Sequence, residues 1–315
     1  MNDSERRWTS RSELDAFCGE RLRDTLLDGL WVAGILDGLR APCVAVVGAR
    51  APSDDGRRRA RRLAETLARN GVCVISGLAL GIDAAAHEGA LAAGAPTIGV
   101  LGGGHAHFFP PRNRDLGTRI AASGGAVVSP FAPDVQPQRW QFLARNAIIA
   151  ALCDAVVVVE AAARSGALNT AGHGADRGIP VLAFPGDVDR PKAAGCNALI
   201  RDGATLVRDA DDVLAALPTF ALRAEDTPAT GSSRAARTGA PRRRDDAVRA
   251  ASFVREDDSD AVRRVIAVLA DGPRDAGLLA DELGLSAAQV FPLLSELEID
   301  GRIGCGAGGY ALLCR

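Results

Sequence analysis

Residues 72–83 read Val-Cys-Val-Ile-Ser-Gly-Leu-Ala-Leu-Gly-Ile-Asp, an apolar run that stops in a Ser/Gly turn just before an alanine-rich segment. The pattern predicts a buried strand that passes through a tight turn into a helix over residues 84–93. A turn of this kind leaves free backbone N–H groups pointing at one spot, where they can hold an anion such as phosphate. Residues 76–83 are therefore a candidate phosphate loop.

A second stretch repeats this pattern. Residues 165–171, Ser-Gly-Ala-Leu-Asn-Thr-Ala, follow the apolar run 155–159. The carboxyl ends of parallel strands meet at one edge of a sheet, so the two loops can face a single ligand with more than one phosphate. The alternative is that both are ordinary strand-to-helix turns, in which glycine serves only the backbone geometry.

Short apolar runs alternate with helical patterns through the first two thirds of the chain. The runs cover residues 43–47, 72–75, 97–101, 126–128, 155–159, 181–184 and 205–207. Near-continuous Val/Ile/Leu runs separated by helices are typical of a parallel sheet covered on both faces. The sequence therefore predicts an α/β fold with a Rossmann-like, doubly wound and mostly parallel sheet.

Composition divides the chain into four predicted segments. Residues 1–40 form a short N-terminal extension, and residues 41–218 form the Rossmann-like domain. Residues 219–257, rich in Thr, Ser, Pro, Gly and Arg, are typical of a flexible linker. In residues 258–315, three helical patterns and a glycine-rich hairpin predict a small C-terminal winged-helix domain.

The charge of the winged helix argues against duplex DNA as its partner. Residues 258–315 hold five arginines and nine carboxylates, and the third helix carries Glu296, Glu298 and Asp300 without a basic residue. Phosphates would repel such a helix. A protein contact or a structural role is therefore favoured over a transcription regulator that reads duplex DNA.

Overall composition excludes several classes of protein. With 47% hydrophobic and 24% charged residues the chain is globular, and its net charge of -2 means that phosphate binding requires a local patch. Seven scattered cysteines without a C-x-x-C pair indicate reduced thiols in the cytoplasm. Because no signal peptide and no membrane-spanning segment are evident, we expect a cytoplasmic protein without a membrane partner.

Several kinds of cofactor and catalytic site lack their sequence signals. The first strand ends in Val47-Gly48-Ala49-Arg50 rather than in G-x-G-x-x-G, and no P-loop motif is present. His105 and His107 have no neighbouring carboxylate or cysteine and are interpreted as loop residues rather than metal ligands. Asp83 and Glu160, at strand ends, are assigned structural roles. We expect no cofactor, no metal and no catalytic residue.

Polar and aromatic residues at the strand ends fit single-stranded nucleic acid. Arginines bind phosphate bidentately, amides bind bases or sugars, and an exposed aromatic ring stacks on an unpaired base. The alternatives are a core position for Phe142 and an ion pair for Arg145. The residues concerned are Arg50, Arg112, Asn113, Phe142, Arg145 and Asn146.

An ordered series of motifs over residues 42–217 resembles the DNA processing protein A (DprA/Smf) family. The winged helix after a linker also resembles a domain often appended to this family. The motifs are Val46-Val47-Gly48-Ala49-Arg50, residues 76–87, Pro110-Pro111-Arg112-Asn113, Arg145-Asn146, Val158-Val159-Glu160-Ala161, residues 165–171, Phe184-Pro185-Gly186 and residues 197–204.

The resemblance implies a homodimeric, non-enzymatic protein that binds single-stranded DNA, protects incoming DNA during natural transformation and helps to load the RecA recombinase. Together with the residue patterns above, it gives a set of expected DNA contacts. These are Arg50, Ser76, Gly77, Gly81, Arg112, Asn113, Phe142, Arg145, Asn146, Ser165, Gly166 and Asn197.

The chain departs from the family pattern at two positions where a basic residue is common, which hold Leu80 and Ala147. The N-terminal helical domain of many members also looks absent or shortened. An alternative of another class is a nucleotide phosphoribohydrolase-like enzyme on a similar fold. In that family a catalytic glutamate stands three residues past the threonine of the second loop, where this chain has His173 after Thr170.

Overall fold

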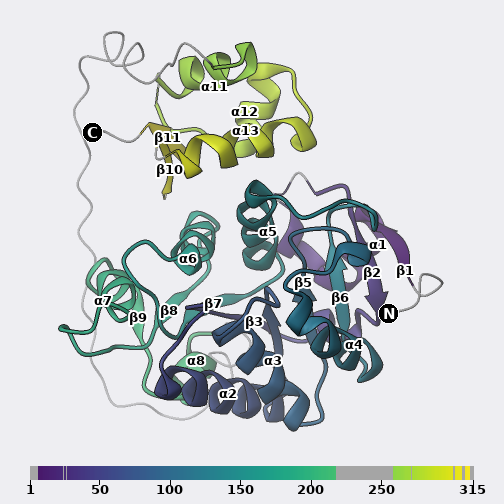
Figure 1. Cartoon of the computed structure of the whole chain (residues 1–315), viewed down its shortest axis with the longest axis vertical. Helices are drawn as coiled ribbons and strands as arrows, with labels where there is room; N and C mark the ends of the chain where they lie inside the picture. The colour runs from purple at the N-terminus through teal and green to yellow at the C-terminus, as the bar shows by residue number, and fades with distance from the viewer. Residues whose placement is uncertain are drawn as a thin grey trace, which may run out of the picture.

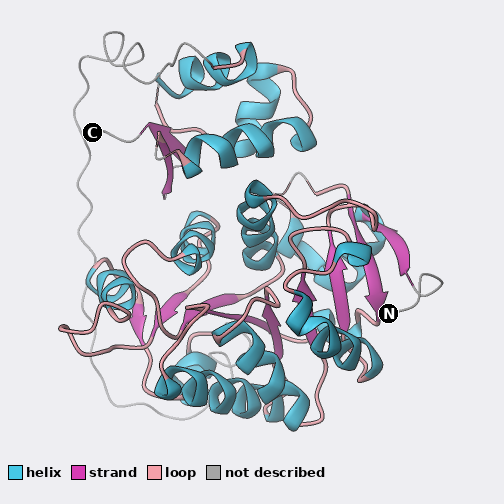
Figure 2. Cartoon of the chain, in the orientation of Figure 1, coloured by secondary structure: helices cyan, strands magenta, loops and turns pink. Residues whose placement is uncertain are grey.

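The computed structural model describes residues 6–217 apart from 24 and 26, and residues 258–312 apart from 271, 301, 307 and 308. Its large domain is built on one sheet, whose strands are magenta in Figure 2. The strands lie in the order β1-β2-β6-β5-β4-β3-β7-β8-β9. The seven strands from β6 to β9 in this order run parallel, which confirms the predicted doubly wound sheet. They are β3 (Cys43–Val47), β4 (Cys73–Ser76), β5 (Thr97–Val100), β6 (Ala126–Ser129), β7 (Ala155–Val158), β8 (Val181–Ala183) and β9 (Thr205–Leu206).

The segment predicted as a short N-terminal extension, residues 1–40, adds strands to the sheet. It contributes β1 (Arg6–Ser10), α1 (Arg11–Cys18) and β2 (Gly29–Gly34), and β2 pairs antiparallel with both β1 and β6. Trp8 on β1 stacks against Trp31 on β2, with ring centroids 5.6 Å apart. The apolar run of residues 30–33 was the available local signal for β2. Its pairing with β6, about 100 residues away in sequence, is set by the fold.

Helices cover both faces of the sheet. One face carries α2 (Asp54–Arg69), α3 (Ile82–Ala92), α4 (Arg114–Ala122) and α8 (Ala210–Ala215). The other carries α1, α5 (Arg139–Ala151), α6 (Gly166–Asp176) and α7 (Ala194–Arg201). Short 3₁₀ turns lie at Gly19–Leu22, Asp37–Arg40, His105–His107 and Pro111–Asn113.

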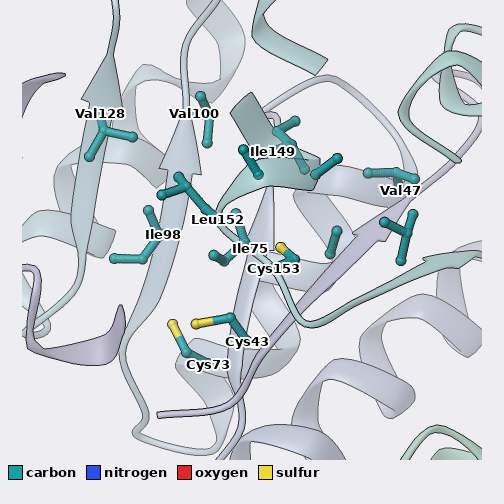
Figure 3. Packing of buried hydrophobic residues seen from close by; sticks show 14 of the residues in the cluster. Cys43, Val47, Cys73, Ile75, Ile98, Val100, Val128, Ile149, Leu152 and Cys153 are labelled. Carbon is teal, nitrogen blue, oxygen red and sulfur yellow. The ribbon is translucent and has the colours of Figure 1, made fainter. Parts of the chain in front are cut away.

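β3 shows why the sequence reads as a continuous apolar run. All five residues are buried. Their side chains alternate between the two faces of the sheet, so they pack into two separate cores. Val44 and Val46 pack under α2 and α3, whereas Cys43 and Val47 pack under α5 and α6. Figure 3 shows Cys43 and Cys73 side by side in the latter core, and both are buried free thiols.

The C-terminal domain is the predicted winged helix. It consists of α11 (Asp260–Ala270), α12 (Ala276–Leu283), α13 (Ala287–Ile299) and the hairpin of β10 (Ile303–Gly306) and β11 (Gly309–Leu312). Val265, Ile266 and Leu294 are fully buried in a core of its own. The predicted linker, residues 219–257, lies outside the described residues. Within the part of the chain that the structure describes, no helix is both long and apolar enough to cross a membrane.

Candidate nucleic-acid interface

The loop after β4, residues 77–81, is closed around a carboxylate from its own chain. The backbone N–H groups of Gly77 and Ala79 donate to Asp83 Oδ2 at 3.1 and 3.3 Å. Asp83 therefore occupies the position at which the sequence predicted an external phosphate. The turn has the expected geometry, but two of its donors are already satisfied, so its role is to fix the loop.

Buried polar side chains support this loop from within. Leu78 adopts φ 56°, a left-handed conformation that costs a non-glycine residue about 1–2 kcal/mol. Asn113 Nδ2 donates to Leu78 O and Ala79 O at 2.9 and 3.0 Å, and the Ser76 hydroxyl donates to Val46 O at 2.7 Å. Ser76 is fully buried and Asn113 nearly so. Ser76 and Asn113 therefore hold the loop from within, and neither side chain faces solvent in this structure.

Arg145 is likewise buried behind the loop rather than presented to solvent. It lies beside Asp83, and both side chains press against Gly77 so closely that a Cβ there would overlap the guanidinium. Burial lowers the pKa of Arg145 to about 10, and the Asp83 charge acts against that change. Burial raises the pKa of Asp83, while Arg145 and the two N–H donors act against the rise. Arg145 is therefore buried close to the Asp83 carboxylate, and its Nε has no hydrogen-bond partner among the described residues.

An exposed arginine and two aromatic rings meet beside the loop. Arg50 lies over the Phe142 ring, with its Cζ 5.8 Å from the centroid, and Phe109 meets Phe142 edge-on at 5.6 Å. Phe109 is 46% exposed, Phe142 is half-buried and Arg50 is exposed. Gly81, at φ 87°, lies against the backbone of Arg50, where a Cβ would stand 2.7 Å from the Arg50 carbonyl oxygen. We call Arg50, Phe109 and Phe142 the arginine–aromatic platform.

Further groups lie near the platform. Arg112 is exposed on the same short turn as Asn113. Lys192, the single lysine of the chain, donates from Nζ to Ala51 O at 2.6 Å, next to Arg50. Leu80 is 36% exposed. Positive charge therefore gathers at this edge, with an apolar side chain at the tip of the loop.

The second predicted loop begins α6. Ser165 caps the helix by accepting from the Ala167 N–H at 3.4 Å, and Gly166 is exposed. Asn146 Nδ2 on α5 donates to Gly166 O at 3.2 Å and to Asn169 Oδ1 at 3.1 Å. Asn146 is mostly buried, so it orders this loop from the adjacent helix.

Asn197 is tied to a different part of the sheet edge. Its side chain exchanges two hydrogen bonds with the backbone of Gly186, after β8, at 3.0 and 3.1 Å. Glu160, after β7, accepts from the N–H and the hydroxyl of Ser53 and so holds the start of α2. These contacts agree with the structural role predicted for Glu160.

Two of the three histidines considered above, His105 and His173, are buried against other parts of the chain. His105 is buried, and its Nε2 lies 2.9 Å from Val127 O. His107 is exposed. His173 is buried with its pKa lowered to about 4, chiefly because burial disfavours the charged ring, and it faces Tyr310 of the winged helix.

Sequence reasoning missed three residues of this region. Phe109 precedes Pro110-Pro111-Arg112, so an aromatic next to a recognised motif was the available signal. Asn169 lies inside the second loop motif and was quoted without a role. Lys192 gave no local signal, because only the fold brings it to Ala51.

Comparison with known proteins gives consistent matches along the chain. A family model for DNA recombination-mediator protein A matches residues 25–218, and one for the DprA winged helix domain matches residues 249–309. Protein Smf of Escherichia coli K12 is 36% identical over 289 residues, which cover 91% of this chain and 72% of Smf.

Two solved structures are each similar to about 70% of this chain. DNA processing protein A from Streptococcus pneumoniae superposes with a TM-score of 0.62 and 37% identity, over 69% of this chain and 78% of that one. The protein of the same name from Helicobacter pylori, whose structure concerns its single-stranded DNA binding mode, gives a TM-score of 0.58 and 26% identity, over 70% of this chain and 97% of that one.

Proposed function

Since the chain belongs to the DNA recombination-mediator protein A (DprA/Smf) family, we propose that it binds single-stranded DNA at the carboxyl edge of its parallel sheet. The observation that carries this proposal is the arginine–aromatic platform. Arg50 offers a charge for phosphate, and Phe109 and Phe142 offer ring surface on which unpaired bases can stack. Duplex DNA keeps its bases stacked inside, so it cannot use the rings in this way.

The buried side chains of the site have a different task in this proposal. Asp83, Asn113 and Arg145 hold the loop of residues 77–81, and the loop in turn holds Arg50 through Gly81. Binding groups that are fixed in advance lose less conformational entropy when a ligand arrives. The expected direct contacts are therefore the platform, Arg112 and the Ser165–Gly166 turn, whereas Ser76, Arg145, Asn146 and Asn197 order the surface.

The wider role proposed here rests on family membership. We infer that the protein acts in the cytoplasm as a homodimer, without enzymatic turnover, protecting incoming DNA in natural transformation and helping RecA to load on it. A pull-down of RecA with DNA-bound protein and a measurement of oligomeric state by light scattering test these two partners separately.

The primary experiment is a fluorescence anisotropy titration with a labelled single strand and with the same sequence as a duplex, each at several salt concentrations. We expect tighter binding to the single strand and an affinity that falls with salt, because arginine contacts release counterions. Equal or tighter duplex binding would overturn the proposal. Release of free base from AMP-type nucleotides, measured in parallel, would instead favour the phosphoribohydrolase-like alternative.

A further inference from the structure

The acidic winged helix lies against the two helices that carry the second loop of the proposed DNA site. α13 packs beside α5, and β10 packs beside α6, as Figure 1 also shows. The surface formed by α5 and α6, here called the α5–α6 face, is therefore occupied by a domain of the same chain.

A chain of hydrogen bonds joins the winged helix to the second loop. Glu298 on α13 accepts from Asn169 Nδ2 at 2.9 Å. Asn169 in turn accepts from Asn146, which also donates to Gly166 O. One turn further along α6, His173 meets Tyr310 with ring centroids 6.4 Å apart. The contact is thus polar and specific, and it ends at the turn where the proposed function places a DNA phosphate.

The negative charge of α13 disfavours DNA binding at the second loop while the winged helix is docked there. Glu298 is partly buried, and α13 also carries Glu296 and no basic residue. A phosphate that approaches the Ser165–Gly166 turn would meet a carboxylate nearby and would find the amide of Asn169 already engaged. Like charges at close range in a partly desolvated site repel strongly.

We propose that the winged helix and single-stranded DNA compete for the α5–α6 face, so that the docked domain lowers the affinity of the chain for DNA. This inference rests on the proposed function. Because the domain is part of the same chain, its docking is an intramolecular event with a high effective concentration. The apparent dissociation constant for DNA then rises in inverse proportion to the fraction of molecules in which the face is free.

The test compares three full-length proteins in the single-strand titration: wild type, Glu298→Ala and Glu296→Ala. Both variants remove one negative charge from α13, but only Glu298 contacts Asn169, whereas Glu296 is exposed. We expect Glu298→Ala to bind single-stranded DNA about 3–10-fold more tightly than wild type. This is the gain if the winged helix covers the α5–α6 face in most wild-type molecules and leaves it free in most molecules of the variant. Glu296→Ala should stay within about twofold of wild type, because its charge is solvated.

A second measurement does not depend on a variant. Hydrogen exchange of wild-type α13 should accelerate when single-stranded DNA is added to saturation, because the domain is displaced. Equal affinity of Glu298→Ala and Glu296→Ala, or unchanged exchange of α13 in the DNA complex, would overturn the competition while leaving the proposed function in place. Absence of single-strand binding in all three proteins would overturn the proposed function and this inference together.

Discussion

Replacing Asp83 by asparagine tests whether the buried carboxylate organises the DNA-binding edge. The substitution keeps the shape of the side chain and removes its charge. Arg145 would then be left buried without its counter-charge, and Gly77 and Ala79 would lose a charged acceptor for their N–H groups. Weakening a buried polar contact by changing one partner costs about 1–3 kcal/mol, and we expect a loss of stability in that range.

The assay is urea unfolding followed by tryptophan fluorescence. Trp8, Trp31 and Trp140 all lie in the large domain, so the signal reports on that domain alone. A matched control is Asp115→Asn, an exposed carboxylate in the first turn of α4, which should cost less than about 1 kcal/mol.

A double variant isolates the pairwise energy. Asp83→Asn combined with Arg145→Met should be less destabilised than the sum of the two single variants, because neither charge is then left without a partner. A loss below about 1 kcal/mol for Asp83→Asn, or additive effects in the double variant, would refute the reasoning.

Three further predictions concern the platform and the buried histidine. Arg50→Ala should weaken single-strand binding and flatten the salt slope by about 0.7, whereas Arg69→Ala, an arginine paired with Glu65 at the far end of α2, should change neither. Phe142→Ala should cost about 1–3 kcal/mol of binding while far-UV circular dichroism stays unchanged; equal affinity would remove it from the interface. Burial lowers the pKa of His87 from the ordinary 6.5 to about 3. As the pH falls, His87 therefore binds a proton in the unfolded chain before it does so in the folded chain, and the free energy of unfolding should fall between pH 6.5 and pH 3. His87→Gln should reduce that slope by about 1.4 kcal/mol per pH unit, as urea unfolding at several pH values would measure.

The parallel sheet could be predicted from the sequence because its strands are buried on both faces. β3 and β7 are uninterrupted apolar runs, and the turns after β4 and β7 carry serine and glycine at the start of a helix. β1, which reads Arg-Arg-Trp-Thr-Ser, has no apolar run. Its strand character comes from pairing with β2, so a local pattern could not reveal it.

The sequence indicated which loops meet at this edge of the sheet, but not which of their side chains are buried. Arg50 and Phe142 lie at the sheet edge as expected, and this follows from their positions in the chain. Whether a backbone N–H faces solvent or Asp83, and whether Arg145 is exposed or buried, depends on how α3 and α5 pack around Gly77. Such tertiary contacts decide between two side-chain roles that the sequence leaves equally possible.

Photo-crosslinking gives the most direct test of whether single-stranded DNA binds on the arginine–aromatic platform. An oligonucleotide with 5-iodouracil would be crosslinked to the full-length protein, and the attached peptides would be identified by mass spectrometry. We expect crosslinks at Phe109 and Phe142, because their rings are accessible for stacking on bases. Crosslinks confined to the winged helix, residues 258–312, would contradict this expectation.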